Sequence, residues 1–582
     1  MKTDVSNFEK YREICRRWLN SPALSESEWQ ELSRVAEDDK ELESRFFAPL
    51  EFGTAGLRGI TGTGLNRMNI HVIRHATQAF ASLIISEGAG ACKKGVVICY
   101  DCRLNSEEFA REAACVMAAN GIAVKIFDAL RPTPELSFAI RLYKATAGLN
   151  ITASHNPKEY NGYKVYWSDG AQLPPGHARA IADAMAATDI FSGIKRTDFD
   201  EAMKKGLIEF IGAETDDAFM KKVMSQAVAP EFVGAVADRF KVVFTPFHGT
   251  GHKLVPDALG RLGLLNLYPV AEQMVIDGSF PTVKSPNPEN PEGFALALEY
   301  AEKIGADLIV GTDPDADRVG VMVRDGNKYA TLSGNQTGVL LLDYIIRTRK
   351  EKGSLPANAA AIKTIVTTEM AREIAVQNGV FITDTFTGFK FMAEKIAEFE
   401  RLGNYECIFA YEESYGYLIG DYVRDKDAVT ASMLITEMAA YHFGNGMTLI
   451  DALNALYAKY GYYRELTLNL EMPGIDGLLK MRSLMSDLRG YPPKEIAGVN
   501  VLKQRDYQNG TVTVAGLGVV GETEIKGSDV LYFELADNTN LIVRPSGTEP
   551  KIKVYILAHG KTASECDEKT GKYTEYAMSL KK

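Results

Sequence analysis

The sequence of 582 residues contains no apolar run as long as the ~18 residues that a helix needs to span a bilayer. Its first ten residues, Met-Lys-Thr-Asp-Val-Ser-Asn-Phe-Glu-Lys, include no apolar h-region, so we expect no cleaved signal peptide. We therefore expect a cytoplasmic protein without a membrane partner.

Cysteine is scarce, with seven residues at irregular spacing. An odd number without a regular pattern indicates a reducing compartment rather than a disulfide framework. Cys99 and Cys102 have the CxxC spacing, but no second pair exists to complete a zinc site. We interpret the pair as structural because Cys99 lies at the end of an apolar run, and a thiol-dependent activity would instead indicate a redox role.

Positive charge is in deficit, since 65 Lys and Arg residues stand against 76 Asp and Glu residues, a formal net charge of −11. This balance opposes nonspecific binding to nucleic acid, which depends on cations that neutralise phosphates. An anionic substrate would need a local cluster of cations, because the net charge of the chain repels it.

The composition is otherwise that of a globular protein, with 46% hydrophobic and 24% charged residues. At roughly 150 residues per domain, the length predicts about four domains. A polar, helix-like stretch runs from residue 8 to about residue 43, and a β-α-β-α-β pattern then occurs three times. The strands predicted for the three copies are 96–100, 123–127 and 148–151; 241–244, 267–270 and 307–310; and 361–366, 380–384 and 407–410.

The last part of the chain has a different pattern. Predicted strands at 530–535, 541–543 and 552–556, with turn residues at 537–540, precede a helix near 563–578. Alternating strands and helices imply mostly parallel sheets, whereas this part reads as an α+β domain. We expect an α/β protein with domains at residues 1–208, 209–325, 326–460 and 461–582.

A polar loop follows the last strand of each copy. Ligands of parallel sheets bind beyond the carboxyl ends of the strands, so three such loops indicate one shared cleft. The loops are 152–157 (Thr-Ala-Ser-His-Asn-Pro), 311–318 (Gly-Thr-Asp-Pro-Asp-Ala-Asp-Arg) and 412–417 (Glu-Glu-Ser-Tyr-Gly-Tyr).

The loop 311–318 places carboxylates at alternate positions, where they can converge on one hard cation. An EF-hand also begins Asp-x-Asp-x-Asp, but here Arg318 and Arg324 replace the glycine and the bidentate glutamate of that motif. Three carboxylates leave room for a further oxygen such as that of a phosphate, which is usual for Mg²⁺. The alternative is a solvated acidic turn. The ligands we predict are Asp313, Asp315 and Asp317.

The remaining loops suit phosphate and sugar groups. Ser154 lacks a Gly-x-Ser-x-Gly elbow, so it needs activation or must itself hold the transferable group. The turn 544–551, Arg-Pro-Ser-Gly-Thr-Glu-Pro-Lys, offers a guanidinium and hydroxyls that suit a phosphate. Glu412 and Ser414 offer polar atoms for sugar hydroxyls. Each of these signals is also compatible with an ordinary solvated turn.

Together these residues resemble the α-D-phosphohexomutase superfamily, which includes phosphoglucomutases and phosphomannomutases. The resemblance covers nearly the whole chain in order. The segments 52–59 (Phe-Gly-Thr-Ala-Gly-Leu-Arg-Gly) and 411–416 (Tyr-Glu-Glu-Ser-Tyr-Gly) resemble its phosphoglucomutase/phosphopentomutase branch. The resemblance implies four domains around a central cleft: three similar α/β domains, for phosphoserine (1–208), metal (209–325) and sugar (326–460), and a phosphate-binding α+β domain (461–582).

The resemblance also implies chemistry. Ser154 would be phosphorylated, its phosphate would complete a Mg²⁺ shell, and a sugar bisphosphate, glucose 1,6-bisphosphate, would be the activator. The implied reaction interconverts glucose 1-phosphate and glucose 6-phosphate. General-base candidates are Lys164, Lys426 and His155, which the sequence leaves open, and Arg58 is a further catalytic candidate. The implied substrate contacts are Thr54, Arg58, Arg318, Thr387, Lys390, Glu412, Ser414, Lys426, Arg544, Ser546, Gly547 and Thr548.

One departure from the family concerns the metal loop, where many members have glycine and this chain has Pro314 and Ala316. The three ligands are intact, but the flanking residues are weaker guides to specificity. Pentose or mannose phosphate as substrate, or synthesis of glucose 1,6-bisphosphate, are the alternatives within this chemistry. A phosphatase or a non-catalytic phosphosugar-binding protein are alternatives outside it, and both monomer and dimer remain open.

Overall fold

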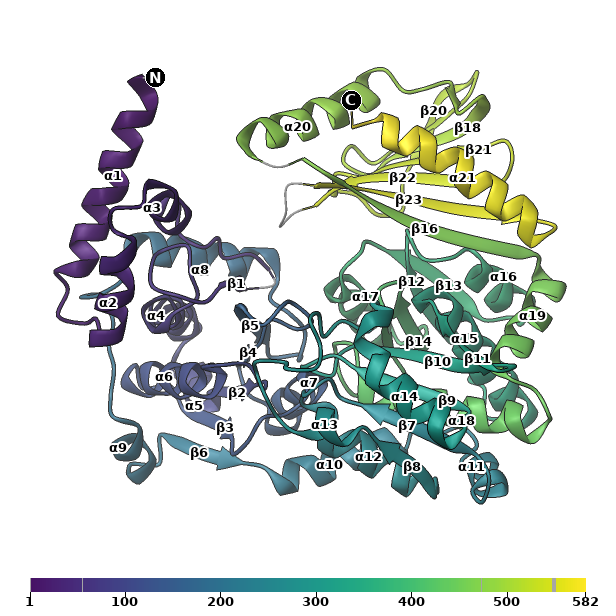
Figure 1. Cartoon of the computed structure of the whole chain (residues 1–582), viewed down its shortest axis with the longest axis horizontal. Coiled ribbons are helices and arrows are strands. Elements are labelled where there is room, and N and C mark those ends of the chain that lie inside the picture. The colour runs from purple at the N-terminus through teal and green to yellow at the C-terminus, as the bar shows by residue number, and fades with distance from the viewer. Residues whose placement is uncertain (1, 55, 473, 547–550, 582) are drawn as a thin grey trace. The chain divides into compact units, whose positions relative to one another are not determined.

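The computed structural model describes residues 2–54, 56–472, 474–546 and 551–581 (Figure 1). The chain divides into two compact units, which we describe separately. Unit 1 comprises Met1–Leu332 and Tyr415–Gly444, and unit 2 comprises Ser333–Ser414 and Asn445–Lys582. Among the described residues, no helix has both the length and the hydropathy that a membrane span requires.

The N-terminal stretch forms three helices rather than one. Ser25 and Glu28 form a capping box that begins the second helix, and Asp38 caps the third by accepting hydrogen bonds from two backbone N–H groups. Such caps satisfy the unpaired N–H groups of a first helical turn, so each marks a helix start. The helices are α1 (Lys2–Leu19), α2 (Glu26–Val35) and α3 (Asp39–Phe46).

The first copy of the repeated pattern builds a six-stranded sheet in the order β1-β5-β4-β2-β3-β6. Strands β4, β2, β3 and β6 run parallel, whereas β5 and β1 are antiparallel to their neighbours. The elements are β1 (Leu57–Ile60), α4 (Ile70–Ser86), α5 (Ala89–Lys94), β2 (Val96–Tyr100), α6 (Ser106–Ala119), β3 (Val124–Phe127), α7 (Thr133–Tyr143), β4 (Ala147–Ile151), β5 (Tyr160–Trp167), α8 (Pro175–Ala187), α9 (Phe199–Lys204) and β6 (Ile208–Ile211).

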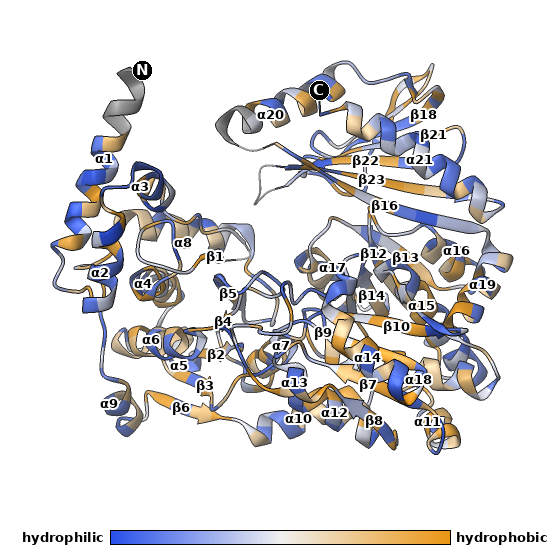
Figure 2. Cartoon of the chain, viewed as in Figure 1, coloured by the Kyte–Doolittle hydropathy of each residue, from blue (hydrophilic) through white to orange (hydrophobic). Residues whose placement is uncertain are grey.

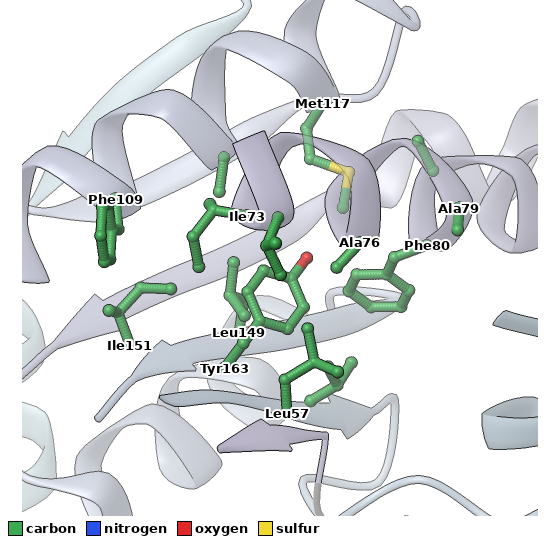
Figure 3. Packing of buried hydrophobic residues seen from close by; sticks show 14 of the residues in the cluster. Leu57, Ile73, Ala76, Ala79, Phe80, Phe109, Met117, Leu149, Ile151 and Tyr163 are labelled. Carbon is green, nitrogen blue, oxygen red and sulfur yellow. The ribbon is translucent and has the colours of Figure 1, made fainter. Parts of the chain in front are cut away.

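Both faces of this sheet are covered, because its strands alternate buried side chains between two cores. Val96 and Ile98 of β2 pack with α4 and α6, whereas Val97 and Cys99 pack against α7. Cys99 is fully buried, which agrees with a structural interpretation. Figure 3 shows the larger core, in which Tyr163 lies among Leu57, Leu149, Ala76 and Phe80.

The second copy forms a five-stranded sheet in the order β11-β10-β9-β7-β8, in which β9, β7 and β8 are parallel. Its helices α10 (Ala213–Met224), α11 (Glu231–Val236), α12 (Gly251–Arg261), α13 (Ala271–Met274) and α14 (Ala295–Ile304) accompany the 3₁₀ turn η1 (Pro291–Phe294). The strands are β7 (Lys241–Thr245), β8 (Asn266–Pro269), β9 (Leu308–Thr312), β10 (Val319–Asp325) and β11 (Lys328–Leu332).

The third copy lies in unit 2, where β13, β12 and β14 form parallel pairs. In each copy the first strand is central, with the third and second strands on either side, so the internal repeat is confirmed at the level of sheet order. The elements of unit 2 are α15 (Gly334–Glu351), β12 (Ala359–Thr364), α16 (Met370–Gln377), β13 (Phe381–Thr385), α17 (Phe389–Leu402), β14 (Glu406–Glu412) and α19 (Leu449–Tyr460).

The segment between β14 and α19 returns to unit 1 as β15 (Gly416–Leu418) and α18 (Ala428–Gly444). Helix α18 packs against α11 and α12, and its first thirteen residues are all buried. The sequence did not predict that unit 1 is completed by residues from the third copy.

The C-terminal part is an antiparallel sheet in the order β16-β23-β22-β21-β18-β19-β20, with β17 paired to β18. Figure 2 shows β22 and β23 mostly in hydrophobic colours, whereas the surface helix α3 is hydrophilic. The elements are β16 (Tyr462–Glu471), α20 (Gly474–Gly490), β17 (Glu495–Ile496), β18 (Val499–Asp506), β19 (Thr511–Val514), β20 (Gly518–Glu522), β21 (Leu531–Leu535), β22 (Asn540–Pro545), β23 (Lys551–Gly560) and α21 (Ala563–Ser579).

The fold class is confirmed: three α/β sheets with parallel cores and an α+β C-terminal part. The predicted domain limits remain predictions. Two strands extend beyond them, because β6 belongs to the first sheet and ends at Ile211, and β11 belongs to the second and ends at Leu332.

Candidate active site

Each of the three polar loops turns at a non-glycine residue with a left-handed backbone. The φ angles are 53° at Ser154, 49° at Ala316 and 65° at Tyr415. This conformation costs roughly 1–2 kcal/mol for an L-residue, and such strain is common at functional sites. Ala316 therefore occupies a position where glycine would be unstrained.

The carboxylates of Asp313, Asp315 and Asp317 converge. Each residue offers one oxygen, these oxygens lie within 4.8 Å of one another, and all three residues are buried. The backbone N–H groups of Asp317 and Arg318 donate to Asp313 Oδ1 at 3.1 and 3.0 Å. The loop therefore points its carboxylates inward by means of its own backbone.

The electrostatics of the triad fit a divalent cation. Burial, together with the charges of Asp315 and Asp317, raises the pKa of Asp313 well above its usual range. Burial also disfavours the charge on Asp317, but Lys426 and Lys164 outweigh it and hold the pKa of Asp317 below its usual value. Within the described part of the chain, Asp315 Oδ1 and Asp317 Oδ1 are buried without a hydrogen-bond partner. Oxygens arranged in this way are the ligands that Mg²⁺ or Ca²⁺ prefers.

Ser154 lies against this triad. Its Oγ donates to Asp313 Oδ2 at 3.0 Å, and the residue is 3% exposed. Its backbone N–H donates to Thr152 Oγ1 at 2.9 Å, which fixes the turn. The structure thus brings together a hydroxyl and carboxylates that are 159 residues apart in the sequence.

His155 lies beside the serine, with Nδ1 3.2 Å from Ser154 Oγ. Burial, followed by the positive charges of Arg318 and Arg58, lowers the pKa of His155 well below its ordinary value. The imidazole is therefore held in its neutral form, and the same burial and charges make it a weak base.

Two lysines contact the triad. One precedes the metal loop in the sequence and the other follows it. Lys164 Nζ lies 2.6 Å from Asp315 Oδ2 and 3.4 Å from Asp317 Oδ2. Lys426 Nζ lies 3.2 Å from Asp317 Oδ2. Burial opposes the charge on Lys164, but the two aspartates raise its pKa above the usual value. Lys164 is therefore an ammonium in this structure.

Three further predicted residues belong to unit 1, and one of them, Arg58, contacts the serine loop. Arg318 Nη1 pairs with Glu289 Oε1 at 2.7 Å. Arg58 is exposed on β1 and donates to Asn156 Oδ1 at 2.9 Å. Thr54 lies in the tight turn before β1, where Gly56 has φ of 81° and an added Cβ would lie 1.8 Å from a backbone oxygen of β5. Only glycine fits this turn.

Arg103, which no sequence motif singled out, organises the serine loop. Its buried guanidinium donates to the carbonyls of Ser154 (2.7 Å), Pro157 (2.9 Å) and Tyr160 (2.9 Å), and also to that of Asn156. It follows the carboxyl end of β2, which is the first strand of its copy. The sequence could have indicated Arg103, because a polar residue just after the carboxyl end of a parallel strand lies at the edge of the sheet where ligands bind.

Thr133 was also missed, since its flanking prolines indicated only a turn. Its Oγ1 donates to Asp315 Oδ2 at 2.8 Å and accepts from Asn150 Nδ2 at 2.8 Å. Its backbone N–H donates to the carbonyl of Asp315 at 2.8 Å. The first copy therefore orients a carboxylate of the second.

In unit 2 the predicted sugar-binding residues gather at one sheet edge. Glu412 is buried at the end of β14, and its Oε1 accepts from the backbone N–H of Gly388 at 2.7 Å. Thr387 precedes that glycine and Lys390 follows it in the first turn of α17. Ser414 is partly exposed two residues after Glu412.

The predicted phosphate-binding residues of unit 2 are described only in part. Arg544 lies near the end of β22, opposite Lys553 of β23. Ser546 donates its backbone N–H to Lys551 at 2.8 Å, closing the hairpin. Gly547 and Thr548 fall outside the described residues.

Comparison with known proteins gives relatives over most of the chain. A phosphoglucomutase of Staphylococcus saprophyticus is 36% identical over 520 residues, covering 89% of this chain and 92% of the relative. A phosphoglucomutase of Staphylococcus aureus strain MRSA252 is 37% identical over 530 residues, with the same coverage of both chains.

Solved structures share the fold at lower identity. A phosphoglucomutase/phosphomannomutase family protein of Burkholderia thailandensis has a TM-score of 0.62 at 18% identity, covering 91% of this chain and 97% of that one. The open form of a Paramecium phosphoglucomutase, parafusin, has a TM-score of 0.65 at 17% identity, covering 91% and 94%.

The models of the phosphoglucomutase/phosphomannomutase α/β/α domains match the three copies of the repeat. Domain I matches residues 49–190, domain II residues 217–326 and domain III residues 333–460. The order of these matches follows the order of the sheets. The chain therefore belongs to the phosphoglucomutase/phosphomannomutase family, within the α-D-phosphohexomutase superfamily.

Proposed function

We propose that this chain is a phosphoglucomutase, which interconverts glucose 1-phosphate and glucose 6-phosphate through a phosphorylated Ser154. The observation that supports it most is the hydroxyl of Ser154 3.0 Å from Asp313 Oδ2, inside a buried carboxylate triad. The names of the two staphylococcal relatives favour glucose phosphate as substrate. We propose a cytoplasmic enzyme that acts on a small phosphosugar, with glucose 1,6-bisphosphate as activator.

The metal that we propose is Mg²⁺. Asp313, Asp315 and Asp317 would hold it together with an oxygen of phosphorylated Ser154. When bound, Mg²⁺ supplies positive charge that stabilises the oxygens of a transferring phosphoryl group.

In the first half-reaction, the phosphoryl group leaves Ser154 Oγ and bonds to the free hydroxyl of a sugar monophosphate. The hydroxyl gives its proton to a base of the site, Ser154 Oγ takes up a proton as its bond to phosphorus breaks, and the product is a bound sugar bisphosphate. After the bisphosphate reorients, Ser154 Oγ takes the other phosphoryl group, which restores the phosphoserine and releases the isomer. No phosphate is lost in the cycle, so water must be excluded.

The residues of unit 1 divide by charge. His155 lies 3.2 Å from Ser154 Oγ and is placed to take the proton of the attacking hydroxyl, but its lowered pKa makes it a weak base. Lys164 is held as an ammonium and can neutralise phosphoryl oxygens. Lys426 is ion-paired with Asp317 and would act in the same way. Arg58, Thr54 and Arg318 would contact the phosphoryl group that reacts.

We assign substrate recognition to unit 2. Glu412 and Ser414 would bind sugar hydroxyls, and Arg544 with Ser546 would bind the phosphate that does not react, because a guanidinium can form two parallel bonds to phosphate. Thr387 and Lys390 would complete this set at the start of α17. The proposed contacts of Gly547 and Thr548 rest on the sequence alone.

The test is a coupled assay for glucose 6-phosphate with the wild-type chain and Ser154→Ala. We expect Ser154→Ala to keep its thermal unfolding midpoint and lose at least 10⁴-fold in kcat, because the covalent relay needs the oxygen. Full turnover in that variant would refute the relay. Comparing kcat/KM on glucose, mannose and ribose 1-phosphates then ranks the sugars, and release of free phosphate without isomer would indicate a phosphatase.

A further inference from the structure

The ammonium of Lys426 is held between two carboxylates. Its Nζ lies 3.0 Å from Asp425 Oδ1 and 3.2 Å from Asp317 Oδ2, and the three side chains are 9%, 1% and 2% exposed. Asp317 belongs to the metal loop, whereas Asp425 has no place in the reaction described above. The second carboxylate therefore needs its own explanation.

Asp425 is itself fixed by the first copy of the repeat. Its Oδ2 accepts from Tyr166 Oη at 2.9 Å and from Gln172 Nε2 at 3.5 Å. Tyr166 lies two residues beyond Lys164 on β5, so the two side chains share the face of the strand that is opposite Tyr163. Burial and the charge of Asp425 raise the pKa of Tyr166 well above its usual value, so the phenol remains a donor.

The Asp425 carboxylate also accepts the backbone N–H of Lys426, at 2.9 Å from Oδ1, whereas the backbone on either side has other partners. The N–H of Arg424 donates to Ser137 Oγ at 2.8 Å, and that of Asp427 donates to the carbonyl of Tyr417 at 2.8 Å. Asp427 caps the first turn of α18 by accepting from Val429 and Thr430 N–H groups. Asp425 Oδ1 thus holds both the backbone N–H and the ammonium of Lys426.

The aliphatic part of the Lys426 side chain also has a restricted path. An added Cβ on Gly416 would lie 2.1 Å from Lys426 Cδ, so the stem crosses the backbone where only glycine leaves room. A lysine side chain loses up to ~2 kcal/mol of rotamer freedom when it is held in one conformation, and partners on both sides are one way to offset that cost.

We propose that Asp425 and Tyr166 are positioning residues that hold the Lys426 ammonium beside the metal loop, where it meets the transferring phosphoryl group. The proposal rests on the proposed mutase function. Tyr166 orients Asp425, Asp425 fixes Nζ from the side opposite Asp317, and neither residue touches the substrate. Loss of either partner lets the ammonium leave its place, so turnover falls while sugar binding by unit 2 is retained.

The test compares Tyr166→Phe and Asp425→Asn with Tyr163→Phe. Tyr163 is the matched control, because it is equally buried on the same strand and its Oη also donates one hydrogen bond, to Thr77 Oγ1 at 3.0 Å. We expect both site variants to lose about tenfold in kcat, the size of one hydrogen bond to a charged group. Their KM should stay within about twofold, and Tyr163→Phe should match the wild type.

A double variant tests whether the effect passes through the lysine. In a Lys426→Gln background, Tyr166→Phe should change kcat by less than about twofold, because the group that it positions is gone. The proposal would be overturned by a second tenfold loss when Tyr166→Phe is added to Lys426→Gln. It would also be overturned if Tyr166→Phe alone kept the wild-type kcat, or if Tyr163→Phe lost as much kcat as Tyr166→Phe. If Lys426→Gln is too slow to assay, the single variants decide alone. A wild-type chain without mutase activity would instead refute the underlying function.

Discussion

At the residue scale, one side chain fixes the loop that presents the serine. The guanidinium of Arg103 donates to four carbonyls of residues 154–160, and Phe280 covers it with a ring centroid 5.2 Å from Cζ. Removing it would leave buried acceptors without donors, at a cost of about 1–3 kcal/mol for each that water cannot reach. The loop geometry therefore depends on a residue that performs no chemistry.

We predict that Arg103→Met lowers both stability and turnover. The free energy of unfolding should fall by about 3 kcal/mol, and kcat should fall at least tenfold because Ser154 is no longer held against Asp313. Urea unfolding and the coupled assay measure the two effects. Arg111→Met is the control, since Arg111 is an exposed partner of Glu107. An Arg103 variant that behaves like the control would contradict this role.

A pH effect is expected at Glu413. Burial, and then the charge of Glu412, raises the pKa of Glu413 to about 7. The folded protein therefore binds a proton that the unfolded chain releases above about pH 4.3, so stability falls as pH rises from there to about 7.

The substitution that tests this effect is Glu413→Gln. Between pH 5 and 7.5 we expect the wild type to lose on the order of 1 kcal/mol of stability relative to the variant. Thermal unfolding at both pH values measures the difference, with the exposed Glu373→Gln as control. Equal pH dependence in wild type and Glu413→Gln would show that the carboxyl titrates normally.

At the scale of elements, the metal loop combines strain with ligands. The left-handed Ala316 is fully buried, so a larger side chain there would have to displace its neighbours. Glycine would relieve the strain but adds about 0.5–1 kcal/mol of unfolded-chain entropy, so the two effects nearly cancel.

We predict that Ala316→Gly changes stability by less than about 1 kcal/mol and retains activity. Ala316→Val should destabilise by more than about 2 kcal/mol and weaken metal binding, because a β-branched residue tolerates neither the backbone nor the space. Thermal shift with and without added Mg²⁺ reads both effects, since a bound metal stabilises the fold. Equal behaviour of the two variants would contradict the assignment of strain.

Many of the strands and loops could be predicted from the sequence. Strand 96–100 and the loops after residues 151, 310 and 410 were predictable, because short apolar runs followed by polar turns define strand ends locally. Arg103 and Thr133 were not singled out, since their partners are contributed by loops distant in the sequence. Residues 415–444 were assigned to the third copy because the sequence shows order along the chain but not which core a helix completes.

At the scale of the whole molecule, unit 1 is discontinuous. Helix α18 comes from beyond the third copy and buries its first thirteen residues, packing against α11 and α12. The backbone N–H of Val319 donates to the carbonyl of Tyr415 at 3.1 Å, and β10, which begins at Val319, pairs with β11, which ends at Leu332. A short linker can therefore join residue 332 to residue 415.

We predict that a fragment of residues 1–332 exposes apolar surface, whereas residues 1–332 joined to 415–444 by a Gly/Ser linker fold. Dye binding to exposed hydrophobic surface and cooperative thermal unfolding distinguish the two polypeptides. A cooperative, dye-free 1–332 fragment would show that α18 is dispensable.

The central claim is that Ser154 holds the group that is transferred. Intact mass measured before and after incubation with glucose 1,6-bisphosphate and Mg²⁺, with the site located by peptide mapping, tests it directly. We expect one added phosphoryl group, on Ser154, which transfers to glucose 1-phosphate when that sugar is in excess. An active enzyme that gains no phosphoryl group, or gains it at another residue, would show that Ser154 is not the carrier.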